Sequence, residues 1–294
     1  MTNIDSLHAL MADGPRRMAC PDEPAYLAAW QAHALPWADA LLPMAVAAGR
    51  IADRLAWVFQ AGYQAACRDA FPDVRSRGWI AYAASEDRKN DPPLPGVTLT
   101  DGCLNGSKTW VAGARSLQQL AIKLGNGPDA QYLLMPRDTP GLTVLPGRTP
   151  RFLSEMSQGQ ARFDRTPLAA TTALDPGRIR HFGLVEPLYV YAAFCGFVLG
   201  GSDEPDLVAC ARDCLAAIAP ALQSVGGTLD RPHLGQADAR AQDLLARLSG
   251  NRLHAAGNWL SDQRLISMYS GNVQRHVQGH SARIDMTTAP LKRP

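Results

Sequence analysis

Several short motifs that identify a class of protein on their own are missing from this 294-residue sequence. It contains no CxxC pair, and neither of the glycine patterns GxGxxG and GxxxxGK(S/T) that hold nucleotide phosphates. No Ser-His-Asp set can be identified from spacing alone. The sequence therefore predicts no phosphate loop and no metal site.

Strong charge, long apolar runs and a leader pattern are also missing. The formal net charge is only +2 and no stripe of Lys or Arg is seen, so we expect no nucleic-acid partner. By inspection, no apolar run reaches the roughly 18 to 20 residues that a membrane helix needs. The N-terminus lacks a basic start followed by a long apolar centre. Together with the scattered cysteines, this predicts a reduced, cytoplasmic protein without a membrane partner.

Two groups of metal-ligating side chains leave alternatives open. Cys210 and Cys214 lie four residues apart and could share a metal with Cys195, or all three could be buried thiols. His276 and His280 have the same spacing and could bind a metal or lie on a surface helix. Since neither group comes with a complete ligand motif, buried thiols and a surface helix are the favoured interpretations.

What the sequence does contain is a residue pattern that changes twice along the chain. Ala/Leu-rich helical spacing fills residues 1–75, short β-type runs separated by Pro, Gly, Asp-Gly and Asn-Gly fill 76–170, and helical patterns return in 171–294. We therefore expect an α+β protein with N-terminal helices, a middle antiparallel β-domain and a C-terminal helical bundle. The apolar segment "VEPLYVYAAFCGFVLGG" predicts a buried helix in that bundle.

Four segments of the middle block occur in a specific order. "LNGSKTWV" resembles the signature hairpin of the acyl-CoA dehydrogenase superfamily, "QYLLMPRDTPGLTV" its later strand pair and "FDRTPL" the strand that closes the β-domain. "AYAASED" occupies the place of the segment that ends in Thr-Glu-Pro. The resemblance covers roughly residues 78 to 168 and implies a short, divergent member of this flavoprotein superfamily.

The resemblance implies an FAD site where the β-domain meets the C-terminal bundle. Trp110 would lie against the isoalloxazine ring, with Tyr82 and Ser85 at its other edges, since an aromatic wall and polar donors suit a flavin. Trp110 could instead be a cross-strand packing residue. The turn "LQSVGG", with Gln223, Gly226 and Gly227, resembles the family's Gln-x-x-Gly-Gly turn at the flavin.

The chain also departs from the family pattern. Ala112 stands where members usually carry a Thr near flavin N5, so it is a cofactor-contact position without its hydroxyl. Asp87 and "RKNDPPLPG" replace the usual Pro and Gly-Ser-Asp. No segment matches the C-terminal one whose Arg reaches the neighbouring subunit's flavin, and both helical blocks are short.

Dehydrogenation beside a thioester needs a carboxylate that takes the α-proton. The family places this Glu either late in the chain, where this sequence has Ser270, or early in the first helix of the C-terminal bundle, where it has Glu186. Glu186 is therefore the candidate catalytic base, although Glu186-Pro187 is also how a helix begins. Glu86 is a second carboxylate near the expected site with a structural role in the family, and Lys108 is expected to be a solvated hairpin charge.

These observations predict an FAD-dependent acyl-CoA dehydrogenase-like enzyme that oxidises an acyl thioester at its α,β bond. A homodimer or homotetramer is expected through the C-terminal helices, or a mixed oligomer with a longer family member. The alternative is a catalytically degenerate member that acts as a partner subunit or acyl-CoA binder. A third possibility is that the resemblance ends with the β-domain.

Overall fold

The N-terminal third of the chain is helical. The structure, a computed structural model, describes residues 3–72, 74, 76–88, 90–148, 150–248 and 257–278, with side chains from residue 7 onward. Its first helices are α1 (Asn3–Asp13), α2 (Glu23–His33), the 3-10 turn η1 (Leu35–Trp37), α3 (Leu41–Ile51) and α4 (Leu55–Ala70). Asp22 begins α2 by accepting a hydrogen bond from the Ala25 amide, as an N-cap side chain does.

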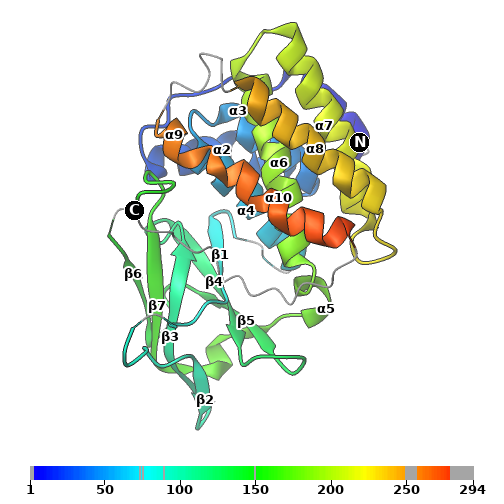
Figure 1. Cartoon of the computed structure of the whole chain (residues 1–294). Helices are drawn as coiled ribbons and strands as arrows, with labels where there is room; N and C mark the ends of the chain where they lie inside the picture. Colours follow the sequence, from blue (N-terminus) through cyan, green and yellow to red (C-terminus); the bar gives the residue numbers. More distant parts are fainter. Residues whose placement is uncertain are drawn as a thin grey trace.

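Two four-stranded sheets follow and form the lower half of the molecule in Figure 1. One has the order β1-β4-β5-β8 and the other β2-β3-β7-β6. Their bounds are β1 (Trp79–Ala83), β2 (Thr98–Thr100), β3 (Cys103–Ala112), β4 (Leu117–Leu124), β5 (Gln131–Pro136), β6 (Leu142–Pro146), β7 (Gln158–Pro167) and β8 (Thr172–Ala173). The pairing is antiparallel except between β1 and β4, which run parallel.

The chain then returns to the helical half. After the 3-10 turn η2 (Leu168–Ala170) come α5 (Pro176–Ile179), α6 (Phe182–Gly201), α7 (Pro205–Ser224), α8 (Arg231–Leu248), α9 (Trp259–Asp262) and α10 (Arg264–Val277). In Figure 1, α10 crosses in front of the bundle, directly above the sheets. The predicted order of helices, strands and helices is confirmed.

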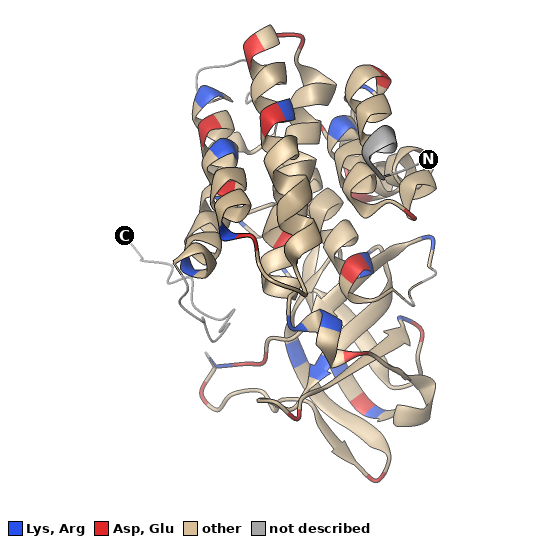
Figure 2. Cartoon of the chain, turned by 90° about the vertical axis from the view of Figure 1, so that its right-hand side faces the viewer, with Lys and Arg blue, Asp and Glu red and all other residues tan. Residues whose placement is uncertain are grey.

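Helix α6 is the centre of the bundle. It packs between α3 and α4 on one side and α7 on the other. Contrary to the sequence count of apolar runs, α6 and α7 are both long and apolar enough to cross a membrane by length and composition. The apolar window of α6 is 100% buried inside the protein, which is the position of a core helix. Basic and acidic residues are interspersed over the other elements in Figure 2.

Close backbone contact between α6 and α3 depends on glycine. A Cβ built on Gly196 would lie 2.3 Å from the Val46 carbonyl oxygen, so an added methyl group must push the two helices apart. We expect Gly196→Ala to lower the free energy of unfolding by about 2 kcal/mol, measured by urea denaturation. The matched control is Gly271→Ala on α10, where a Cβ meets nothing within 4 Å, and there the better helix former is expected to be neutral or stabilising. Equal effects of the two variants would contradict the close approach.

Candidate active site

A cavity of about 630 Å³ opens between the sheets and the helices. Helices α4, α6 and α10 line one side, and strands β3 and β7, the segment after β1 and the loop before β7 line the other. The lining residues are Phe59, Ser85, Glu86, Asp87, Arg88, Asn90, Thr109, Trp110, Phe152, Leu153, Gln158, Gln160, Glu186, Leu265, Met268 and Tyr269. The structure therefore brings Ser85, Trp110 and Glu186 to one cavity.

Trp110 is held in the wall of this cavity by contacts on two sides. Its ring meets those of Phe59 and Tyr63 on α4 edge to face, with centroids 6.2 and 6.1 Å apart. Its Nε1 donates to Gln158 Oε1 over 3.2 Å, and Gln158 Nε2 donates to the Phe152 carbonyl over 3.0 Å. Trp110 is thus a packing residue with a fixed plane, and it also lines the cavity.

The hairpin lysine is not solvated, contrary to the sequence interpretation. Only 1% of the Lys108 side chain is exposed, and its Nζ lies 2.6 Å from Glu86 Oε1. Glu86 Oε1 also accepts from the Val97 amide over 3.2 Å. Burial lowers the pKa of Lys108, and the Glu86 carboxylate opposes that shift. The pair joins β3 to the segment after β1, and of the two residues Glu86 lines the cavity.

The segment that departs from the family pattern is organised by its own aspartate. Asp87 Oδ2 accepts from Asn90 Nδ2 over 2.6 Å and from the Leu94 amide over 2.8 Å. This side chain folds the loop back on itself, as Asp does in turns. Asp87, Arg88 and Asn90 give the cavity a polar edge.

Glu186 lies in the apolar bundle with only 5% of its surface exposed. Helix α6 begins at Phe182 and Pro187 lies inside it, so the interpretation of Glu186-Pro187 as a helix start is wrong. Burial raises the pKa of Glu186 to about 7, because a charged carboxylate is poorly solvated there, and a hydrogen bond with the Tyr269 hydroxyl opposes the rise. A carboxyl group that titrates near neutrality is suited to accept a proton.

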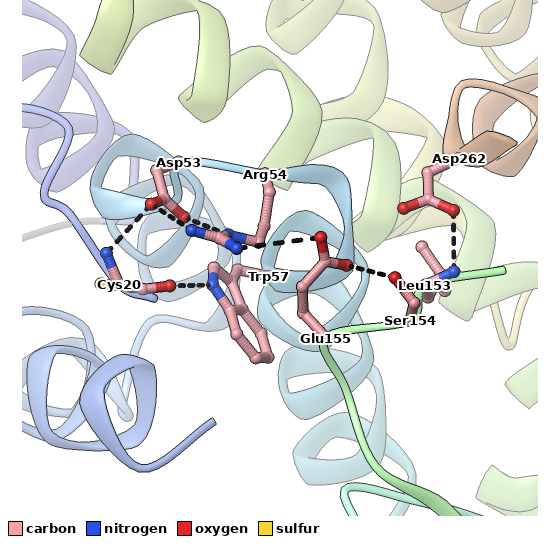
Figure 3. A network of polar contacts seen from close by, with 8 residues as sticks. All are labelled: Cys20, Asp53, Arg54, Trp57, Leu153, Ser154, Glu155 and Asp262. Atoms are coloured by element: carbon pink, nitrogen blue, oxygen red, sulfur yellow. Dashed lines mark hydrogen bonds and ion pairs between the residues drawn. The ribbon is translucent and has the colours of Figure 1, made fainter. Parts of the chain in front are cut away.

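The loop between β6 and β7 forms the outer wall and is tied to helices from both ends of the chain (Figure 3). Its Leu153 amide donates to Asp262 Oδ1 over 2.8 Å, and Arg54 Nη1 lies 3.8 Å from Glu155 Oε1. Arg54 is itself held by both carboxylate oxygens of Asp53 at 2.8 Å. These contacts fix the backbone that carries Phe152, Leu153 and Gln158 into the cavity.

The other expected cofactor contacts lie elsewhere. The Tyr82 ring packs against Phe71 and Phe182, with centroids 5.6 and 5.1 Å away, beside the cavity rather than in its lining. Ala112 is fully buried and pairs with Gln158 across the sheet. The "LQSVGG" turn is not brought to this cavity: Gln223 is exposed on α7, and Gly226 and Gly227 line a separate hollow of about 140 Å³.

Some lining residues carry no sequence signal that would identify them. Phe59 and Gln158 are brought in by helix packing and strand pairing between segments far apart in the chain. Tyr269 precedes Ser270, the position of the late carboxylate, and this neighbour could have identified it. Ser270 itself turns to the bundle, where its hydroxyl donates to Asp238 over 2.8 Å.

The sulfur and imidazole groups form no metal site among the described residues. Cys195, Cys210 and Cys214 are free and buried, so the favoured interpretation as buried thiols is confirmed. Within the described ranges no group of three or more His, Cys, Asp or Glu side chains could hold a metal ion. His276 lies near the end of α10, with Nδ1 2.9 Å from the Asn272 carbonyl, and His280 is outside the described residues.

Comparison by sequence and by structure gives different results. No protein-family model and no curated protein sequence matches the chain. Among solved structures, glutaryl-CoA dehydrogenase from Mycobacterium smegmatis is similar with a TM-score of 0.61 and 12% identity, over 96% of this chain and 95% of that one. PigA with FAD and proline has a TM-score of 0.59 and 13% identity over 95% and 97%. The prolyl acyl carrier protein oxidase AnaB has a TM-score of 0.52 and 15% identity over 84% and 82%.

Proposed function

We propose that this chain, which has the fold of the acyl-CoA dehydrogenase superfamily from its first helices to its last, is a flavoprotein that oxidises an acyl thioester at the α,β bond. The observation that carries the proposal is the meeting of Trp110 from the β-domain and Glu186 from the bundle in one cavity. The likeness over 96% of the chain also removes the possibility that the resemblance ends with the β-domain.

The residues present fit the ring of a flavin. Trp110 offers an aromatic face whose plane is fixed, and Ser85, Thr109 and Gln160 place hydroxyl and amide groups in the same lining. Planar aromatic surface with a few polar donors is what a conjugated heterocycle needs. Trp110 and Ser85 would hold the ring, and Tyr82 would support the wall from behind.

Glu186 supplies the proton chemistry in this proposal. A bound flavin would supply the two-electron acceptor for the substrate. The Glu186 carboxylate removes the α-proton. The Cα–H bond breaks, an O–H bond forms on the carboxyl group, and the electron pair of the broken Cα–H bond moves toward the thioester carbonyl. Leu265, Met268 and Phe59 keep the surroundings apolar, so the carboxylate is weakly solvated and basic near pH 7.

For the substrate we propose an acyl thioester of coenzyme A or of an acyl carrier protein. Glutaryl-CoA dehydrogenase and the prolyl acyl carrier protein oxidase have the same fold, which supports both carriers equally. We also propose a homodimer or homotetramer through the C-terminal helices, or a mixed oligomer with a longer member of the superfamily. The free cysteines fit the cytoplasm as the place of action.

Two observations favour the alternative, a degenerate member that binds acyl-CoA or a partner subunit without flavin chemistry. Ala112 is buried and offers no hydroxyl toward the cavity. In addition, Arg88 is the one Lys or Arg among the described lining residues, so little positive charge faces a dinucleotide's phosphates there.

Absorbance separates the two proposals. We expect the purified protein, as isolated or after addition of FAD and removal of the excess, to absorb at about 450 nm, as oxidised flavin does. The Trp110→Ala variant should bind FAD at least about tenfold more weakly, because it loses the stacking surface. The matched control is Trp37→Ala, at a half-buried tryptophan of η1 outside the cavity lining. A folded protein that stays colourless with excess FAD would favour the degenerate member.

A further inference from the structure

We propose that Tyr269 is the positioning residue for Glu186: its hydroxyl orients the carboxyl group in the cavity and sets the pH at which it accepts a proton. The inference rests on the proposed function, because that function makes Glu186 the catalytic base. The contact between the two side chains itself is independent of any flavin.

The two residues face each other across the cavity from different helices. Glu186 comes from the second turn of α6 and Tyr269 from the middle of α10, and both belong to the cavity lining. Their interaction lowers the pKa of Glu186 and raises the pKa of Tyr269, as a phenol that donates to a carboxylate does. A donated hydrogen bond stabilises the charged form of a carboxyl group, so it lowers the pKa that burial alone would give.

Other titratable groups near Glu186 do not replace this bond. From α4, Tyr63 and Cys67 interact with Glu186 electrostatically. Tyr63 uses its hydroxyl on the backbone of Tyr82, with the Tyr82 amide 2.7 Å away. From the segment after β1, Glu86, Asp87 and Arg88 line the same cavity, and Glu86 is paired with Lys108. Tyr269 is the hydrogen-bond partner that acts on the Glu186 carboxylate directly.

A backbone hydrogen bond that is missing within α6 helps to fix the position of α10 along α6, beside Glu186. Pro187 has no amide hydrogen, so the carbonyl of Gly183, four residues earlier, receives no helical hydrogen bond from it. Asn272 Nδ2 on α10 donates to that carbonyl instead. This bond joins the two helices one turn from the Glu186–Tyr269 contact, since Asn272 lies three residues after Tyr269.

A buried carboxylate fixes the rotation of α10. Asp238 on α8 accepts from the Tyr191 hydroxyl over 2.7 Å, from the Ser270 hydroxyl over 2.8 Å and from Gln274 Nε2. Ser270 and Gln274 lie on the α10 face that turns to α8, whereas Tyr269, one residue before Ser270, lines the cavity. Asn272 and Asp238 together present the Tyr269 hydroxyl to Glu186.

The test is a titration of the Glu186 carboxyl carbon by NMR in protein labelled with ¹³C-glutamate, without flavin or substrate. The resonance is assigned by its loss in Glu186→Gln. We expect a midpoint near 7 in the parent protein. In Tyr269→Phe, which keeps the ring and removes the hydroxyl, the midpoint should rise by about one pH unit. An unchanged or lower midpoint in folded Tyr269→Phe would overturn the proposal.

Two further variants separate positioning from general loosening of the bundle. Tyr26→Phe removes a buried hydroxyl on α2 that donates to the Ala48 carbonyl, so it should lower stability and leave the Glu186 midpoint in place. Asn272→Ala should move the midpoint in the direction of Tyr269→Phe. If Tyr26→Phe moved the midpoint equally, the effect would be one of packing and the inference would fail. Because the titration needs no flavin, a colourless protein would remove the proposed oxidation and leave this result standing.

Discussion

Replacing Glu186 by Gln is expected to lower exchange of the substrate α-proton with solvent by about 10³-fold, because a positioned general base contributes on this order. The amide has nearly the same shape as the carboxyl group and cannot take a proton from carbon. The measurement is deuterium uptake from D₂O at the α-carbon of an acyl-CoA, by mass spectrometry, with protein that retains its flavin. Unchanged exchange would remove Glu186 from the mechanism.

Stability gives this variant an independent control. The pKa of Glu186 is raised by folding, from an ordinary 4.5 to about 7, so ionisation of this group opposes folding as the pH rises through that window. The Gln variant has no such ionisation, and at pH 8 it should be at least as stable as the parent protein. The matched variant Glu204→Gln, at an exposed residue before α7, should leave exchange unchanged.

Glu86→Gln is expected to lower the free energy of unfolding by about 2 to 3 kcal/mol, since it leaves the buried Lys108 ammonium without a counter-charge. We expect a smaller loss of stability than for a fully enclosed ion pair, because 30% of the Glu86 side chain is exposed and water can reach it. Gln can still accept from the Val97 amide, so the change isolates the charge. Urea denaturation at pH 7 measures the effect.

The stability loss of Glu86→Gln is compared with that of Asp243→Asn, which removes the charge of an exposed ion pair. Asp243 and Arg247 form an exposed ion pair on α8, with 2.9 Å between the charged atoms and nearly half of each side chain in water. Surface pairs of this kind contribute about 0.5 kcal/mol or less. If both variants lost equally little stability, the Lys108–Glu86 pair would not be the buried contact that the structure shows.

Much of the fold could be predicted because each block has its own local pattern. The helical spacing of residues 1–75 and 171–294 and the turn residues between the β-type runs are local signals, and they agree with the helices and strands observed. The parallel pairing of β1 with β4 was not predicted, because strand partners are chosen by contacts distant in sequence. The start of α6 was missed because apolar residues before Pro187 resemble a linker and a helix equally.

The site could be predicted only in part, for the same physical reason. Trp110 lies in a short motif and Glu186 is a charge in an apolar helix, so each can be singled out from its neighbours. Gln158 and Tyr269 can be recognised only when tertiary contacts are known. The burial of Lys108 was missed because hairpin charges usually face water, and only its carboxylate partner Glu86 makes a buried ammonium tolerable.

The outer wall of the cavity has a consequence for how this protein acquires its shape. The loop between β6 and β7 is held by Glu23, which accepts from the Ser157 amide 134 residues away, and by Asp262, 109 residues beyond Leu153. Contacts with such large sequence separation form late, because the intervening chain must first be brought together. The wall should therefore be among the last parts to become protected from amide hydrogen exchange during refolding. A fragment that carries the strands alone would keep Trp110 and this loop, but it would lose Glu23 and Asp262, which hold the loop in place.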